Sequence, residues 1–123
     1  METRDVTEKM LAVLESGSVE EREQVATDPS ATERVSMKAM GDESWWVRMA
    51  AAGNVSASER VSMRALGDET ADVREAAAGN VSLPVESADA LLRTADPKLA
   101  EALARNEALP EGIRVAALLK AGL

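Results

Sequence analysis

The segment RVSMKAMGDE at residues 34–43 returns as RVSMRALGDE at residues 60–69, a displacement of 26 positions. A second segment, AAAGNVS, occupies residues 50–56 and recurs at residues 76–82 with the same displacement. Repetition at a fixed period of about 20–50 residues is the sequence signature of stacked structural units. The period continues in one uninterrupted column of large apolar residues: Leu14, Met40, Leu66, Leu92 and Leu118. The sequence therefore predicts a repeat protein.

Each unit carries start and stop signals for two short helices. Before the first helix, Ser30 and Ser56 each precede a glutamate by three residues, which is the spacing of a capping box. Gly67 follows this helix as a C-cap. The second helix starts after a column of residues whose side chains can accept a hydrogen bond from the first helical turn: Ser18, Ser44, Thr70 and Asp96. These signals therefore predict a pair of helices in each unit.

We expect these pairs to stack into an all-α solenoid without β-sheet, because one pair of this length cannot bury its apolar face alone. The chain then forms a single helical-repeat domain over residues 1–123, with about four and a half units of 26 residues. Its parts are an N-terminal capping helix at 1–17 and units at 18–43, 44–69, 70–95 and 96–121. Asp89 stands in an otherwise apolar column, so we expect its carboxylate to face water while Leu91 and Leu92 pack inward.

The composition excludes most catalytic and metal chemistry. The 123 residues include no cysteine and no histidine, which removes disulfides, thiol nucleophiles, imidazole bases and the usual zinc ligands. The carboxylates show no calcium-loop spacing. No apolar run approaches the roughly 20 residues of a membrane span, and residues 1–17 lack the pattern of a secretory signal. We therefore expect a cytoplasmic protein that uses no metal, cofactor or membrane.

The unit that contains Asn80, Pro84 and Leu91, with the following ADPKLAEALARN at residues 95–106, resembles the leucine-rich repeat variant family. Units of this family carry an Asn-Pro turn, a second proline, a leucine pair, an aspartate and a Val-Arg pair followed by small residues. Other matching residues are Pro29, Asp42, Val47-Arg48, Asp68, Val73-Arg74 and Pro110, although no single unit carries the whole pattern. The resemblance covers nearly the full chain.

This resemblance implies a right-handed superhelix of alternating α and 3₁₀ helices without sheet. It implies no iron–sulfur cluster here, because the cysteine-rich segment that carries the cluster in the founding type is absent. HEAT-like α-solenoids, built from paired α-helices, are the near alternative. The spacing of Asp68 and Arg74 fits the Asp-Arg ladder of those proteins equally well.

A candidate binding patch stands out when equivalent positions of the units are compared. The column of Trp46 holds Glu20, Asp72 and Lys98, and the column of Met49 holds Glu23, Glu75 and Glu101. Both columns are therefore expected to face solvent, and only one unit is apolar at both. We predict a partner-binding patch of Trp45, Trp46, Arg48 and Met49, with Trp45 half-buried and Arg48 as its polar rim. The alternative is that Trp46 folds over the neighbouring helix as a lid.

Two sets of basic residues could track a phosphate backbone. One is Arg22, Arg48 and Arg74; the other is Arg34, Lys38, Arg60 and Arg64. However, 22 acidic residues oppose 14 basic ones, and the net charge of −8 repels nucleic acid. Because Arg48 and Arg74 follow Asp42 and Asp68 by six residues, an ion-pair ladder between helices is the simpler interpretation.

The last predicted helix starts near Pro110 and carries too few charged residues to make its whole outer face polar. Terminal units of a solenoid need a polar outer face, or they associate. We therefore predict self-association, most simply as a two-fold homodimer, through Ile113, Val115, Leu119 and Leu123.

These observations favour a non-enzymatic module that binds an unidentified protein partner through the tryptophan patch. The alternative is a repeat protein that binds nucleic acid through the arginine columns. The negative net charge makes us expect no nucleic-acid binding. An enzyme is not expected, because no carboxylate pair has a visible reason to be buried.

Overall fold

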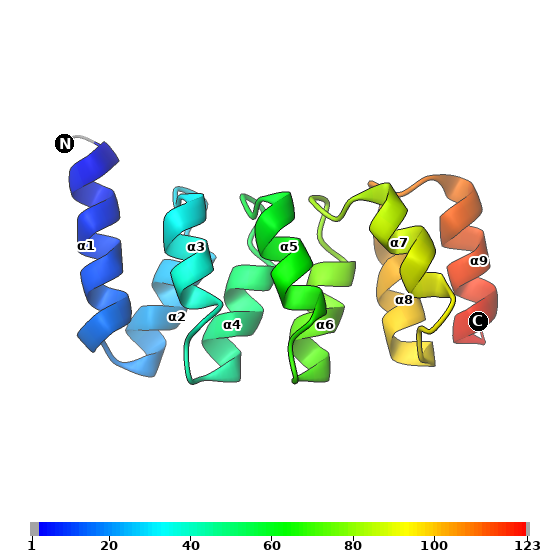
Figure 1. The fold of residues 1–123 in the computed structure, drawn as a ribbon, viewed down its shortest axis with the longest axis horizontal. Coiled ribbons are helices and arrows are strands. Elements are labelled where there is room, and N and C mark those ends of the chain that lie inside the picture. Colours follow the sequence, from blue (N-terminus) through cyan, green and yellow to red (C-terminus); the bar gives the residue numbers. More distant parts are fainter. Residues whose placement is uncertain (1–2, 123) are drawn as a thin grey trace.

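The computed structural model describes residues 3–122, and within that range the chain contains nine α-helices and no strand. The helices are α1 (Thr3–Ser16), α2 (Val19–Thr27), α3 (Glu33–Ala39), α4 (Trp45–Ala52), α5 (Glu59–Leu66), α6 (Ala71–Ala78), α7 (Val85–Leu92), α8 (Pro97–Arg105) and α9 (Glu111–Ala121). They stand side by side along one axis, with α1 and α9 at opposite ends (Figure 1). The all-α prediction is confirmed.

The spacing of 26 residues persists in the helix boundaries. The helices α2, α4, α6 and α8 begin at residues 19, 45, 71 and 97, and α3, α5, α7 and α9 begin at residues 33, 59, 85 and 111. The first set forms one layer, in which each helix contacts the next. In the other layer, α1 contacts α3, α3 contacts α5, and α7 contacts α9. Residues that are 26 apart therefore occupy equivalent places on neighbouring helices.

The predicted caps of α2, α4, α6 and α8 all lie at N-cap positions. The hydroxyl of Ser18 accepts from the backbone N–H of Glu21, and the carboxylate of Asp96 accepts from that of Leu99. Glu21 completes a capping box by accepting from the backbone N–H of Ser18, and this bond lowers the pKa of its carboxyl group. Ser44 and Thr70 make no such side-chain bond.

The predicted N-caps of α3 and α5 are wrong by two residues. Thr32 and Ser58, rather than Ser30 and Ser56, accept from the first turns of α3 and α5. Ser30 and Ser56 belong to preceding turns, where their backbone N–H groups donate to Asp28 and to Asn54 at 2.9 and 2.8 Å. A short polar side chain favours a turn as readily as a cap, so spacing alone did not separate the two.

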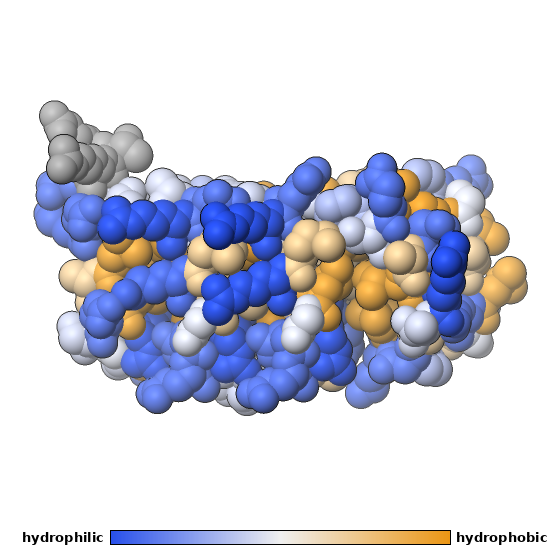
Figure 2. Space-filling view, in the orientation of Figure 1, coloured by the Kyte–Doolittle hydropathy of each residue, from blue (hydrophilic) through white to orange (hydrophobic). Residues whose placement is uncertain are grey.

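Small apolar residues form the core between the layers. Val35, Val47, Val61 and Val73 are fully buried, and alanines fill most of the remaining space. The core consists of two clusters, one from Met10 to Ala77 and one from Ala78 to Ala117, and Leu66 packs against both. Figure 2 shows apolar surface exposed between polar edges, most broadly over the C-terminal half.

The side chains of the apolar column become more exposed to solvent toward the C-terminus. Leu14 and Met40 are buried, Leu66 and Leu92 are half-buried, and Leu118 is exposed. The predictions for the unit around α7 are confirmed: Asp89 is exposed, whereas Leu91 and Leu92 pack against the second cluster. Over residues 3–122, no helix has the length and apolarity that crossing a bilayer requires.

Candidate functional site

Two stacked tryptophans open α4. The ring centroids of Trp45 and Trp46 lie 4.1 Å apart with an interplanar angle of 24°. Trp45 is half-buried and packs against the first core cluster, as predicted, whereas Trp46 keeps 48% of its surface exposed. The inner ring therefore holds the outer ring at the surface. Such stacking contributes about 0.5–1.5 kcal/mol beyond burial, so the exposed ring is preorganised.

The comparison between units predicted the exposure of Trp46 correctly. Glu20, Asp72 and Lys98, its equivalents on α2, α6 and α8, are all exposed. The Met49 column differs from the prediction, because Glu23, Met49, Glu75 and Glu101 are all half-buried. Met49 packs partly against the first core cluster, since this position faces the seam between neighbouring helices of the layer.

A surface groove of about 510 Å³ begins at Met49 and crosses α6 to α8. Its lining includes the small residues Ala76, Gly79 and Ala102, whose short side chains leave a depression where the helices meet. Charged side chains complete the lining: Asp72, Glu75, Lys98, Glu101 and Arg105. Since Trp46 and Met49 are three residues apart on one helix, the exposed ring and the groove lie on neighbouring surface.

Arg48 does not form the polar rim of the tryptophan patch, and that prediction is corrected. Its side chain is nearly buried, with Nε 2.9 Å from a carboxylate oxygen of Asp68. One terminal nitrogen also donates to the carbonyl of Asp42 at 2.8 Å. The guanidinium is thus committed to joining α4 to the turn before α6, because a buried charge requires a partner.

A ladder of ion pairs therefore joins successive units. Arg22 contacts Asp42 as Arg48 contacts Asp68, with Nε to Oδ2 distances of 2.9 Å in both pairs. Each pair spans 20 residues, whereas the sequence suggested partners six residues apart. Arg74 donates to the carbonyl of Asp68 at 2.7 Å, but threonine occupies position 94, where the next aspartate would stand.

Three of the four residues in the second basic set, Arg34, Lys38 and Arg64, are also engaged. Arg34 pairs with Glu8 at 3.1 Å, and Lys38 pairs with Glu15, whose pKa is lowered by the hydrogen bond from that lysine. Arg64 donates to the carbonyl of Met37 at 3.2 Å. These contacts, together with the net charge of −8, work against a phosphate-binding stripe.

An asparagine ladder, which the sequence did not reveal, runs through the same layer. The side-chain nitrogen of Asn54 donates to the carbonyls of Ala26 and Asp28 at 2.8 and 2.9 Å. Asn80 and Asn106 repeat this geometry on the carbonyls 28 and 26 residues before them. All three asparagines are buried. The recurrence of Asn at a spacing of 26 was the only available signal.

The last helix exposes part of the predicted self-association surface. Leu119 and Val115 are 75% and 47% exposed. Ile113 is half-buried and packs partly against the second core cluster, so only part of its side chain lies at the surface. Leu123 lies outside the described residues. The exposed surface also includes Leu118, the last member of the column of large apolar residues.

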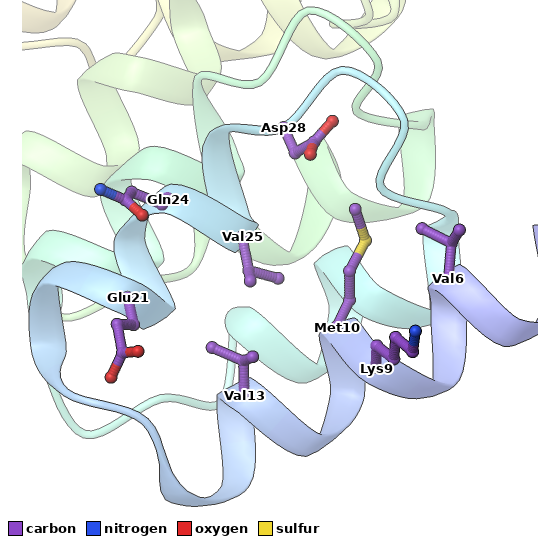
Figure 3. A pocket seen from close by; sticks show the side chains of 8 residues that line it. All are labelled: Val6, Lys9, Met10, Val13, Glu21, Gln24, Val25 and Asp28. Atoms are coloured by element: carbon purple, nitrogen blue, oxygen red, sulfur yellow. The ribbon is translucent and has the colours of Figure 1, made fainter.

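A second hollow, of about 420 Å³, lies between α1 and α2 (Figure 3). Val13 and Val25 face one another across it, and Met10 lies beside them. Lys9, Glu21, Gln24 and Asp28 also line it. The hydrogen bond from the backbone of Ser30 lowers the pKa of Asp28, which therefore stays ionised. The sequence analysis did not identify this hollow.

Within residues 3–122, no cluster of acidic side chains has the arrangement of a metal site. Comparison with protein-family models, with curated proteins and with solved structures finds no match to this chain. The functional argument therefore depends on the geometry described above.

Proposed function

We propose that this chain is a non-enzymatic, cytoplasmic interaction module: a right-handed helical solenoid of about four and a half 26-residue units that binds a protein partner through Trp46. The recurrence of helix starts at 26 residues and the two ladders between units support the solenoid. The leucine-rich repeat variant and HEAT-like families remain the proposed relatives.

The exposure of Trp46 is the observation that carries the binding proposal. A tryptophan with 48% of its surface exposed keeps a large apolar area in water, and burying that area favours association. Tryptophan is enriched among the residues that dominate binding energies. Trp45 holds the ring in place before a partner arrives, which lowers the entropy cost of binding. The binding surface comprises Trp46, the partly exposed Trp45 and Met49.

The test is capture of partners from a native lysate by the wild-type chain and by Trp46→Glu, with nuclease treatment. Glutamate is acceptable at this position, because Glu20 and Asp72 occupy it on neighbouring helices. We expect retention of a specific protein to fall by about tenfold or more. Val55→Glu is the matched control, since Val55 is a 74% exposed apolar residue in a turn.

Circular dichroism should show that both variants remain folded. A protein retained equally by wild type and Trp46→Glu would contradict the proposal, as would recovery of nucleic acid alone. Loss of the protein with both variants would also contradict it, because any added charge would then have the same effect.

A further inference from the structure

The surroundings of Trp46 point to the chemistry of its partner. Trp46 and Met49 lie on α4, which contacts α2 on one side and α6 on the other. At the equivalent positions, α2 carries Glu20 and Glu23, and α6 carries Asp72 and Glu75. The apolar pair is thus flanked on both sides by a pair of carboxylates. Neighbouring helices lie about 8–10 Å apart, which one long basic side chain can span.

Two basic residues near these carboxylates face other partners, whereas Lys98 lines the same groove as Asp72 and Glu75. Arg22 and Arg48 lie on the same helices as the flanked pair, but their guanidinium groups bind Asp42 and Asp68 in the ladder. Arg105 pairs with Glu101 at the far end of the groove. Glu20 and Asp72 are exposed and available to an incoming cation.

Resting on the proposed function, we infer that the partner presents an arginine-rich segment, one of whose guanidinium groups stacks on the exposed face of Trp46. A guanidinium over an indole ring is attracted by the negative face of the ring, and it can also form paired hydrogen bonds with carboxylates. An uncharged segment would cover Glu20 and Asp72 without replacing their hydration, which costs free energy. The net charge of −8 would also accelerate the approach of a cationic partner.

The test measures binding of fluorescein-labelled hexaarginine by fluorescence anisotropy. Trp46→Gln leaves the net charge unchanged, and we expect it to weaken binding about fivefold to tenfold through the lost stacking. Val55→Gln is its control and should change the Kd less than about twofold. Hexalysine should bind more weakly than hexaarginine, because an ammonium group stacks and pairs less well.

The double variant Glu20→Gln/Asp72→Asn tests the flanking carboxylates. Glu59→Gln/Glu107→Gln removes the same charge from exposed positions elsewhere, so the two variants share one net charge. We expect the first to weaken hexaarginine binding about tenfold and the second about twofold. Equal losses would overturn the inference, since they would show attraction by net charge alone.

Stronger binding of an uncharged or an acidic hexapeptide would also overturn the inference, by indicating another kind of occupant. The outcomes of the two proposals are separable. If Trp46→Glu abolishes capture of a protein from lysate but hexaarginine binding is independent of Trp46, the binding module stands and the arginine-rich partner is wrong. If hexaarginine binding requires Trp46 but captured proteins do not, the proposed function fails.

Discussion

At the scale of single residues, buried amide groups connect the units. The side chain of Asn80 donates to the carbonyls of Ala52 and Asn54, and its own oxygen accepts from the backbone N–H of Ser82 at 3.0 Å. One side chain therefore satisfies two carbonyls at the C-terminal end of α4, in the preceding unit, and shapes the turn of its own unit. Aspartate cannot do this, because an ionised carboxylate only accepts.

Replacing Asn80 with alanine should destabilise the protein by about 2–4 kcal/mol, because two buried carbonyls lose their donors. The measurement is urea unfolding followed by circular dichroism. Asp28→Asn is the control, since Asp28 occupies the same column but accepts hydrogen bonds from Ser30, two residues later, and the stability should change by less than about 1 kcal/mol. Comparable losses in the two variants would contradict the role of the ladder.

The arginine ladder provides a second prediction at this scale. Arg48→Lys should cost about 1–3 kcal/mol, because an ammonium group cannot bind both the Asp68 carboxylate and the Asp42 carbonyl in the same geometry. Arg74→Lys should cost less, since position 94 offers no carboxylate. Thermal unfolding of both variants tests the difference. An equal loss of stability would show that the ion pair between Arg48 and Asp68 does not stabilise the protein.

At the scale of helices, the position of a residue in the unit does not determine whether its side chain caps the helix. Ser18 and Ser44 are equivalent residues, but only Ser18 caps its helix with its side chain. Asp42 accepts the backbone N–H of Ser44 at 2.9 Å while it also binds Arg22. No aspartate stands at the corresponding position before α2, where Ser16 lies.

Ser18→Ala should therefore cost about 1 kcal/mol, the usual loss for a broken N-cap. Ser44→Ala should cost less than about 0.5 kcal/mol, because the backbone N–H that binds Asp42 is kept. Guanidinium unfolding of the two variants measures both values. A larger loss for Ser44→Ala would show that its hydroxyl contributes in a way that the hydrogen bonds do not explain.

At this scale, prediction from sequence succeeded where the signal was local. Ser18, Ser44, Thr70 and Asp96 all lie at N-cap positions as predicted, because a cap and the helix it starts are adjacent in the chain. Only Ser18 and Asp96 accept through their side chains. The caps of α3 and α5 were wrong, because Asp28 and Asn54 draw the preceding serines into turns. That competition is also local, since each serine lies two residues after the side chain that it binds, so residue spacing alone cannot separate a turn from a cap.

At the scale of the whole molecule, the two ends of the row differ. The α1 end has an apolar hollow with charged residues in its lining, whereas α9 exposes Val115, Leu118 and Leu119. The contact between α8 and α9 is extensive, and Lys120 donates to the carbonyls of Leu92 and Arg93 at 2.6 and 3.1 Å. Helix α9 is therefore anchored by its inner face while its outer face stays apolar.

Self-association through this outer face remains a prediction. Leu119→Asp should convert a dimer into a monomer of 13.0 kDa, because a carboxylate in an apolar contact costs its hydration. Sedimentation equilibrium over a range of concentrations measures the mass, with Val55→Asp as the control at another exposed apolar position. A wild-type mass that stays monomeric at every concentration would contradict the prediction.

The sequence by itself determined the all-helical class, the helix spacing of 26 residues and the exposure of Trp46 and Asp89. Each of these follows from apolar periodicity and from comparing equivalent positions in the chain, which need no knowledge of distant contacts. Only the tertiary structure decided that Arg48 binds Asp68, that Asn80 binds the carbonyl of Ala52 and that Met49 lies half-buried at a seam. Backbone carbonyls occur at every residue and carry no sequence signal, and a guanidinium can reach several carboxylates. The packing of one unit on the next selects among them.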